Sequence, residues 1–497
     1  MTTAASNGGH GRAIASSTLW QLGSQAVMAV LSVLATKFVT LALEKELAGY
    51  YNSAYGYLQI FGILADFGLY AVAVREVNRA TDRMRTLGAF FVVRFCILTI
   101  SLGLAIGIVL SVPHWRESPF ALSVIIASLV PFFTLLAGML RTVFQVEYRL
   151  HFVFIAEVVQ RIITTALIGA FVLLGYRNSS EVWVEQAFLW IGGGGAFVLL
   201  VLSAVYASRL VKLRLCFDKA LIRHIVVLAM PFGVAYICMT LYRQLDVVFI
   251  AFLRPDFAIQ NAYYGIVGRV EDMAFLIPTF LLNSVLPMLV MRRDKGQDVR
   301  DLLGKTLLIL LLTGSVFTLA SCIWAKPLTL LLSRPDYLST AAYAGADRAF
   351  ELTGPVMFLN GIVLYCFYAM LATHSWRRLT ASLATGAVLS VILNLLLIPK
   401  WGFQGAAVAM VVVHIQLSLL LLPQVQRALP ARLTRDEILR WLAFSALLAA
   451  FLWLLRPYLT TFPVIVAGCA AFSAWIGFSA WICGIFPLLR FSRPDRS

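Results

Sequence analysis

Long apolar runs, separated by short basic stretches, constrain this chain more than any other feature of its sequence. A run of about 20 apolar residues matches the hydrocarbon core of a bilayer, which is about 30 Å thick. Only 13% of the residues are charged, whereas a soluble domain has about a quarter. Because lipid offers the backbone no hydrogen-bond partners, such runs should be helices. The sequence therefore predicts an all-α, polytopic membrane protein with about fourteen transmembrane helices.

The predicted helices leave no room for a large domain outside the membrane, since the longest connection covers about residues 325–347. The first run is too long for the apolar region of a signal peptide, so we expect no cleavable signal. We predict helices at 14–42, 49–74, 87–112, 119–141, 152–175, 184–207, 222–253, 262–291, 304–325, 348–373, 379–398, 402–424, 437–456 and 463–488.

The basic residues follow the loops in an alternating pattern. If the chain starts in the cytoplasm, the even-numbered loops and both tails carry 26 of the 40 Lys and Arg residues, and the odd loops carry 9. Cytoplasmic loops are enriched in basic residues, so both termini are predicted to be cytoplasmic. The net charge of +16 is explained by this topology, and we expect no nucleic-acid partner.

The motifs of soluble enzymes and metal sites are missing from the sequence. The seven cysteines are scattered without a C-x-x-C spacing, and we interpret them as apolar packing residues. No metal-ligand spacing occurs, and no Walker motif is present to bind ATP. We therefore expect no cofactor, and a proton or sodium gradient or the membrane potential as the driving force.

Ionisable residues inside the predicted helices are the candidate functional residues, because each costs about 2.5–3.5 kcal/mol at a helix centre. Such residues are rarely left facing lipid. The bases are Lys37, Arg94, Arg161, Arg243 and Arg269. The acids, with coupling or structural roles, are Asp66, Glu157, Asp246, Glu271 and Asp272.

Two interpretations of these charges stay open. In the first, they neutralise one another on single helix faces, and Lys37 and Arg94 reach the lipid headgroups. The predicted pairs are Arg243–Asp246, Arg269–Asp272 and Glu157–Arg161. In the second, several bases line a wet cavity in which arginine holds phosphate oxygens. For Asp66, a contact with Arg94 is the preferred prediction.

Three segments resemble known sequences. The first is Gly49–Ala54 followed by Ala65–Leu69 and Val74–Glu76. The second is Pro231–Gly233 with Leu241–Asp246, and the third is Asn394–Ala407. In this order they resemble the bacterial polysaccharide-export and O-antigen-type flippases of the multidrug/oligosaccharidyl-lipid/polysaccharide exporter superfamily. In the third segment, Pro399 and Gly402 also predict a tight turn between two spans.

The resemblance implies two six-helix lobes around a central cavity, residues 1–215 and 216–428, with an extra helix pair and cytoplasmic tail at 429–497. It implies a flippase in the bacterial inner membrane. The flippase would carry undecaprenyl-diphosphate-linked oligosaccharide from the inner to the outer leaflet, for polysaccharide or lipopolysaccharide biosynthesis. The resemblance also implies that the five intramembrane bases bind the diphosphate and the glycan in the cavity. Its expected partners are that lipid-linked oligosaccharide, membrane lipids and other membrane proteins of polysaccharide assembly. The extra pair either forms a groove for the polyprenyl tail or serves packing alone.

Two other functions compete with this one. A cation-coupled multidrug exporter of the same superfamily would favour an acidic cavity, whereas five intramembrane bases are present. A membrane-embedded glycosyltransferase or polymerase would need carboxylates on sizeable outer loops or a metal site. The few outer acids of this chain have no such spacing. The sequence therefore favours a transporter over an enzyme.

Overall fold

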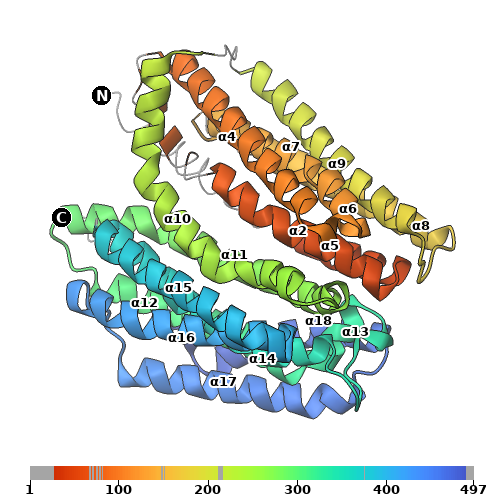
Figure 1. The fold of residues 1–497 in the computed structure, drawn as a ribbon. Helices are drawn as coiled ribbons and strands as arrows, with labels where there is room; N and C mark the ends of the chain where they lie inside the picture. Colours follow the sequence, from red (N-terminus) through yellow and green to blue (C-terminus); the bar gives the residue numbers. More distant parts are fainter. Residues whose placement is uncertain are drawn as a thin grey trace. The chain divides into compact units, whose positions relative to one another are not determined.

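The computed structural model of the chain is helical wherever it has regular structure among the residues that it describes (Figure 1). These residues are 27–66, 69, 72, 73, 76, 77, 80, 82–146, 149, 151–210, 216–373 and 375–488. Residues 14–26 of the first predicted helix, both termini, and Phe67, Gly68, Val74 and Arg75 of the first motif lie outside them. The chain divides into two compact units, Met1–Thr240 and Leu241–Ser497.

In unit 1 the apolar helix Val27–Ala42 is followed by further helices of different lengths. These are α2 (Lys45–Asp66), α4 (Arg83–Ser111), α5 (Pro113–Arg116), α6 (Pro119–Ala127), α7 (Leu129–Val146), α8 (His151–Leu173) and α9 (Val182–Ser208). Helix α10 (Lys219–Leu253) begins in unit 1 and ends in unit 2.

Unit 2 continues with the helices that follow α10 in the chain. They are α11 (Phe257–Asp294), α12 (Arg300–Ile323), α13 (Ala325–Leu332), α14 (Ala346–Ala372), α15 (Trp376–Trp401), α16 (Phe403–Ala428), α17 (Arg435–Leu455), α18 (Phe462–Ile482) and α19 (Ile485–Leu488). Two short 3-10 helices, η1 (Pro335–Tyr337) and η2 (Arg456–Tyr458), lie between them.

The predicted fold class is confirmed, because each of the fourteen predicted segments contains helix. Within the described part of the chain, twelve helices are long and apolar enough to cross a membrane. The other two predicted spans are Val27–Ala42, which is shorter, and α2, which is less apolar. The 38 residues of α11 extend over about 57 Å, so this helix is longer than a bilayer core is thick. The predicted domain boundaries and central cavity stay predictions.

In unit 1, polar side chains tie neighbouring helices together inside the apolar bundle. Helix α2 packs against α4 and α6, and α9 packs against α7 and α8. The Tyr57 hydroxyl of α2 donates to the Ala105 carbonyl of α4 over 2.8 Å. Ser101 of α4 donates to the Phe61 carbonyl of α2 over 2.8 Å. Such bonds contribute about 0.6 kcal/mol each between membrane helices, so small-residue packing supplies much of the remaining stability.

In unit 2, α14 lies at the centre and packs against α11, α12 and α16 (Figure 1). Gly314 of α12 faces the Phe358 backbone of α14, and a Cβ there would lie 3.0 Å from the Phe358 Cα. This close approach lets Thr318 of α12 donate to the Gly354 carbonyl over 2.9 Å. Small residues therefore set the α12–α14 distance.

The C-terminal pair, α17 and α18, packs against α12 and α13 of unit 2. The indole of Trp324 is buried there and donates to the Leu452 carbonyl over 2.7 Å. Trp441 donates to Ser315 of α12 over 3.0 Å. These contacts give the pair a packing role, and a groove for a polyprenyl tail stays a prediction.

The turn between α15 and α16 is the tight turn that Pro399 and Gly402 predict. Gly402 has φ +56° and ψ −136°. Residues other than glycine hardly ever adopt this backbone conformation. The Gln260 carboxamide oxygen accepts from the Phe403 amide over 3.0 Å. Arg254 donates to the Pro399 carbonyl over 3.1 Å. The start of α11 therefore holds this turn in place.

Candidate functional site

The ten predicted site residues divide equally between the two units. Each group is described within its own unit. Unit 1 holds Lys37, Asp66, Arg94, Glu157 and Arg161, and unit 2 holds Arg243, Asp246, Arg269, Glu271 and Asp272.

In unit 1 the predicted contact between Asp66 and Arg94 is confirmed. The Arg94 guanidinium of α4 forms an ion pair with the carboxylate at the end of α2. Arg94 is only 3% exposed, and its Nη1 also lies 3.8 Å from the Met139 sulfur of α7. The Arg94 Nε is buried without a hydrogen-bond partner. Arg94 is therefore a buried, charge-paired arginine with one donor unused.

The predicted pairing of Glu157 with Arg161 on α8 is wrong. Glu157 instead accepts from Arg141 of α7 over 3.3 Å. Arg161 turns to the other neighbouring helix and donates to Ser32 over 2.7 Å. Partners on adjacent helices approach these side chains more closely than the residue one turn away. Lys37 lies half-buried on the same helix as Ser32.

In unit 2 the predicted pairing of Arg243 with Asp246 is also wrong. The Arg243 guanidinium lies 3.7 Å from Asp272 of α11 and 4.6 Å above the centre of the Phe275 ring. Its Nε is buried without a hydrogen-bond partner, and Asp272 is half exposed. Arg269 lies half-buried on α11, three residues before Asp272. Arg243 is thus held by a long ion pair and a ring face, with donors to spare.

Asp246 forms hydrogen bonds with uncharged side chains and not with a base. The carboxylate is 2% exposed and accepts from the Tyr264 hydroxyl of α11 over 2.6 Å. The Asn394 amide of α15 lies 3.4 Å from its other oxygen and 3.2 Å from Ser390. The Asn394 carboxamide oxygen is buried without a hydrogen-bond partner. No ion pair reaches Asp246 from any residue that the structure describes.

Further polar groups are buried on the helices around Asp246. Glu271 of α11 is 4% exposed, and its Oε1 has no hydrogen-bond partner. His414 of α16 is fully buried, with Nδ1 placed 2.8 Å from the Met410 carbonyl. The ring of Tyr242 stands edge-on to His414, with 5.4 Å between the ring centres. Unpartnered polar atoms are rare in protein interiors, so the spans of unit 2 contain a polar region suited to water or a small ion.

The oxygen atoms in this region determine which ion it could hold. Sodium and other hard cations prefer carboxylate, carbonyl and hydroxyl oxygens. Asp246 and the unpartnered oxygen of Asn394 offer such ligands, and a carboxylate could equally take up a proton. No cluster of three or more His, Cys, Asp or Glu residues suited to a transition metal occurs in the described part of the chain.

The sequence also matches a family of known proteins. A family model described as "Polysaccharide biosynthesis protein" matches residues 14–291. This range is more than half of the chain and covers both groups of intramembrane charges. The chain belongs to this family. No reviewed protein sequence matches this family member closely enough to count as a relative.

Solved structures share the fold of this family member at low sequence identity. Lipid II flippase MurJ in an inward closed conformation has a TM-score of 0.67 at 12% identity, covering 93% of this chain and 98% of that one. An inward-facing multidrug resistance MATE transporter has a TM-score of 0.61 at 10% identity, covering 81% and 94%. The Vibrio cholerae MATE transporter VcmN has a TM-score of 0.56 at 13% identity, covering 84% and 96%. At this level of identity the matches show a shared fold, which this family member has in common with a lipid II flippase and with multidrug transporters.

Sequence reasoning missed several polar residues that the fold of this family member buries. Tyr264 and Asn394 contact Asp246, but they lie 18 and 148 residues away in the chain. Glu185 of α9 is fully buried and lies 3.1 Å from the Ser123 hydroxyl of α6. It lies in the first turn of α9. A search for polar residues at the same predicted depth on different spans could have predicted the contacts of Tyr264 and Asn394 with Asp246.

Proposed function

We propose that this protein is a flippase that moves undecaprenyl-diphosphate-linked oligosaccharide from the inner to the outer leaflet of the bacterial cytoplasmic membrane. It would do so by alternating access, and its product would feed polysaccharide or lipopolysaccharide biosynthesis. Membership of a polysaccharide biosynthesis family supports this proposal. The fold, which is shared with a lipid II flippase, supports it too.

The observation that carries the proposal is the state of Arg243. This arginine lies within a span, yet its ion pair to Asp272 is long and its Nε has no partner. A lipid diphosphate that enters the membrane needs fixed positive charge to replace its hydration. Arginine supplies bidentate hydrogen bonds to phosphate oxygens. Arg243 therefore has the chemistry and the spare donors to hold a diphosphate.

The other intramembrane bases extend the same role. In the proposal, Arg269 joins Arg243 on the diphosphate in unit 2, and Lys37, Arg94 and Arg161 contribute positive charge in unit 1. Asp272 would act as a resident counter-ion, which the arriving phosphate displaces from Arg243. The ion pair is long and Asp272 is half exposed, so a phosphate could replace this carboxylate without first breaking a short, fully buried pair.

We place the coupling of transport to an ion at Asp246. Its carboxylate is buried among Tyr264 and Asn394, and the described residues give it no basic partner. A buried carboxylate in that setting needs either a proton or a cation to balance its charge. Uptake and release of H⁺ or Na⁺ at Asp246 would then drive the change between inward-open and outward-open states.

A cation-coupled multidrug exporter is the second candidate function. The fold that this chain shares with multidrug transporters favours it, as do the buried acids Asp246 and Glu271. Such an exporter would bind organic cations through these acids, whereas a flippase would bind phosphate through Arg243 and Arg269. Loss of the bases and loss of the acids therefore separate the two functions.

The test is a deletion strain that is complemented with variants. We expect undecaprenyl-linked repeat units to accumulate at the inner leaflet when the gene is deleted. Arg243→Ala and Arg269→Ala should each abolish surface glycan export while the protein still inserts. The matched control is Arg116→Ala, which removes an exposed base at the end of α5. Wild-type export from both span variants at normal expression would contradict the proposal. Drug sensitivity without a glycan defect in the deletion strain would favour the exporter.

A further inference from the structure

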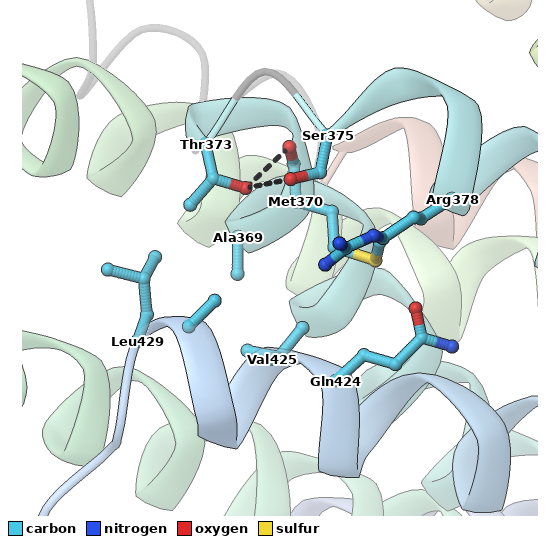
Figure 2. Close-up of a pocket in the computed structure, with 9 residues that line it drawn as sticks. Ala369, Met370, Thr373, Ser375, Arg378, Gln424, Val425 and Leu429 are labelled. Atoms are coloured by element: carbon cyan, nitrogen blue, oxygen red, sulfur yellow. Dashed lines mark hydrogen bonds between the residues drawn. The ribbon is translucent and has the colours of Figure 1, made fainter.

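A pocket in unit 2, apart from the intramembrane charges, lies where three helices end or begin. The end of α14, the start of α15 and the end of α16 surround about 270 Å³ of space, including the part open to solvent (Figure 2). Its polar lining residues are Thr373, Ser375, Arg378 and Gln424. Apolar residues lie next to them, with Met370 beside Arg378 and Val425 beside Gln424 (Figure 2). A ligand that has a charged group next to an apolar part would match this lining.

Arg378 is the charged group of this pocket. Its guanidinium extends toward the space between Ser375 and Gln424 (Figure 2). The side chain is exposed, and no residue that the structure describes forms an ion pair or hydrogen bond with it. An arginine in this state offers up to five donors to an anion. The pocket therefore has an unneutralised positive charge at its mouth.

The hydroxyl groups beside Arg378 add a further donor. The Thr373 hydroxyl lies 3.0 Å from both the Met370 carbonyl and the Ser375 hydroxyl oxygen. Thr373 has a single proton for these two acceptors. When it donates to Ser375, the proton of Ser375 is left for a ligand. Arg378 and Ser375 can thus bind one oxyanion together.

The depth of the pocket points to a membrane lipid as the source of that anion. Spans α14, α15 and α16 all end or begin beside it, and span ends lie at the level of lipid headgroups. Exposed bases, Arg377 and Arg427, flank the same helix ends. Clusters of basic residues at span ends attract anionic lipids, and the apolar residues of the pocket are suited to the lipid carbons next to a phosphate.

We propose that this pocket binds the headgroup phosphate of an anionic phospholipid, with Arg378 and Ser375 on the phosphate and Met370 and Val425 against the lipid's apolar part. This site goes beyond the proposed flippase function, because it uses none of the residues assigned to the diphosphate or to ion coupling. A lipid bound there would link α14, α15 and α16 at one membrane face.

The experiment is a titration of the purified, delipidated full-length protein with short-chain phosphatidylglycerol, followed by native mass spectrometry. We expect Arg378→Ala to weaken binding about tenfold, which is the loss of roughly one charge-assisted hydrogen bond. The control is Arg116→Ala, which removes an exposed arginine at the end of α5 that does not line the pocket, and it should change binding less than about twofold. Ala428→Trp should fill the pocket and weaken binding without any change in charge.

Titrations with other ligands distinguish a lipid phosphate from a free phosphate ion. Phosphatidylethanolamine, which has no net charge, should bind more weakly than phosphatidylglycerol. Inorganic phosphate at the same concentration should not displace phosphatidylglycerol, because it lacks the apolar part. Equal binding to wild-type protein, Arg378→Ala and Ala428→Trp would overturn the proposal. Displacement by inorganic phosphate would assign the site to a free anion and overturn the lipid as its ligand.

Discussion

Arg243 of α10 lies 3.7 Å from Asp272 of α11, and it does not pair with Asp246 one turn along its own helix. The two acids near this arginine, Asp272 and Asp246, therefore have different roles. Asp272 is half exposed and balances the charge of Arg243, whereas Asp246 is buried with Tyr264 and Asn394. This separation lets one helix carry both a phosphate contact and an ion site.

A charge exchange tests whether Arg243 serves substrate binding or only structure. The double variant Arg243→Asp with Asp272→Arg keeps the pair but moves the positive charge to the other helix. Because the double variant keeps both charges and the original pair is long, we expect thermal stability to change by about 1 kcal/mol or less. Surface glycan export should nevertheless be lost, since the guanidinium no longer occupies its site. Recovery of export in the double variant would assign a purely structural role to Arg243.

The buried pair of Arg94 with Asp66 should behave in the opposite way. Asp66→Asn leaves the buried Arg94 charge uncompensated and should destabilise the protein by about 3 kcal/mol. The double variant Asp66→Asn with Arg94→Met should recover most of that loss, because an unpaired buried charge is no longer present. Thermal unfolding of the purified variants in detergent measures both effects. Additive losses in the double variant would contradict a coupled pair.

Substitution of Asp246 tests ion coupling. Asp246→Asn has the same shape and can still accept the Tyr264 hydrogen bond, so we expect normal insertion and stability. It cannot take up a proton or carry negative charge, so transport should lose its dependence on the H⁺ or Na⁺ gradient. The matched control, Asp256→Asn, lies in the loop before α11 and should keep that dependence. Unchanged ion dependence in Asp246→Asn would place coupling elsewhere.

The sequence predicted the fold well, because hydropathy reports the cost of backbone and charge in lipid directly. It predicted the Asp66–Arg94 contact because the two residues were expected at similar depth on neighbouring spans. It failed for Glu157 and Arg243, since one-turn spacing identifies neighbours on a helix but not the closer partner that another helix supplies. Glu157 pairs with Arg141, and Arg243 pairs with Asp272.

The polar surroundings of Asp246 could not be predicted for a related reason. Tyr264 and Asn394 reach this carboxylate from α11 and α15, and their meeting depends on how the helices rotate about their axes. Hydropathy gives the depth of a residue but not the direction that it faces. The third sequence motif contains Asn394. The motif therefore marked the segment, but it did not predict the contact of Asn394 with Asp246.

The turn at Gly402 should be intolerant of any side chain. Gly402→Ala forces a residue with a Cβ into a glycine-only backbone region, and the added carbon would crowd the Gln260 carboxamide. We expect a loss of about 1–3 kcal/mol in stability. The matched control is Gly103→Ala in α4, where a Cβ meets nothing within 4 Å, and alanine there should be neutral or stabilising. Thermal unfolding of both variants checks the contrast, and equal effects would contradict it.

The acid stability of the same turn should depend on Asp256, which lies outside the spans. Burial acts to raise the pKa of Asp256, but hydrogen bonds from Arg254 and Gln260 outweigh it and hold the pKa below its usual value. The folded state therefore binds the proton less readily than the unfolded state. The contribution of the carboxylate to the free energy of unfolding is present near neutral pH. It declines as the pH falls below the usual pKa, and it is lost once the pH falls below the pKa of the folded state.

The measurement is the difference in apparent melting temperature between wild-type protein and Asp256→Asn from pH 7 to pH 3.5. The difference should favour the wild type at neutral pH, because Arg254 and Gln260 lose their charged acceptor in the variant. It should shrink as the medium becomes acidic, since protonation turns the wild-type carboxylate into a neutral group that resembles asparagine. The control pair, Asp298→Asn, removes an exposed carboxylate with a 4.0 Å contact to Arg300 and should give a small, nearly constant difference. A difference for Asp256 that stays constant with pH would mean that the ion pair does not hold the turn.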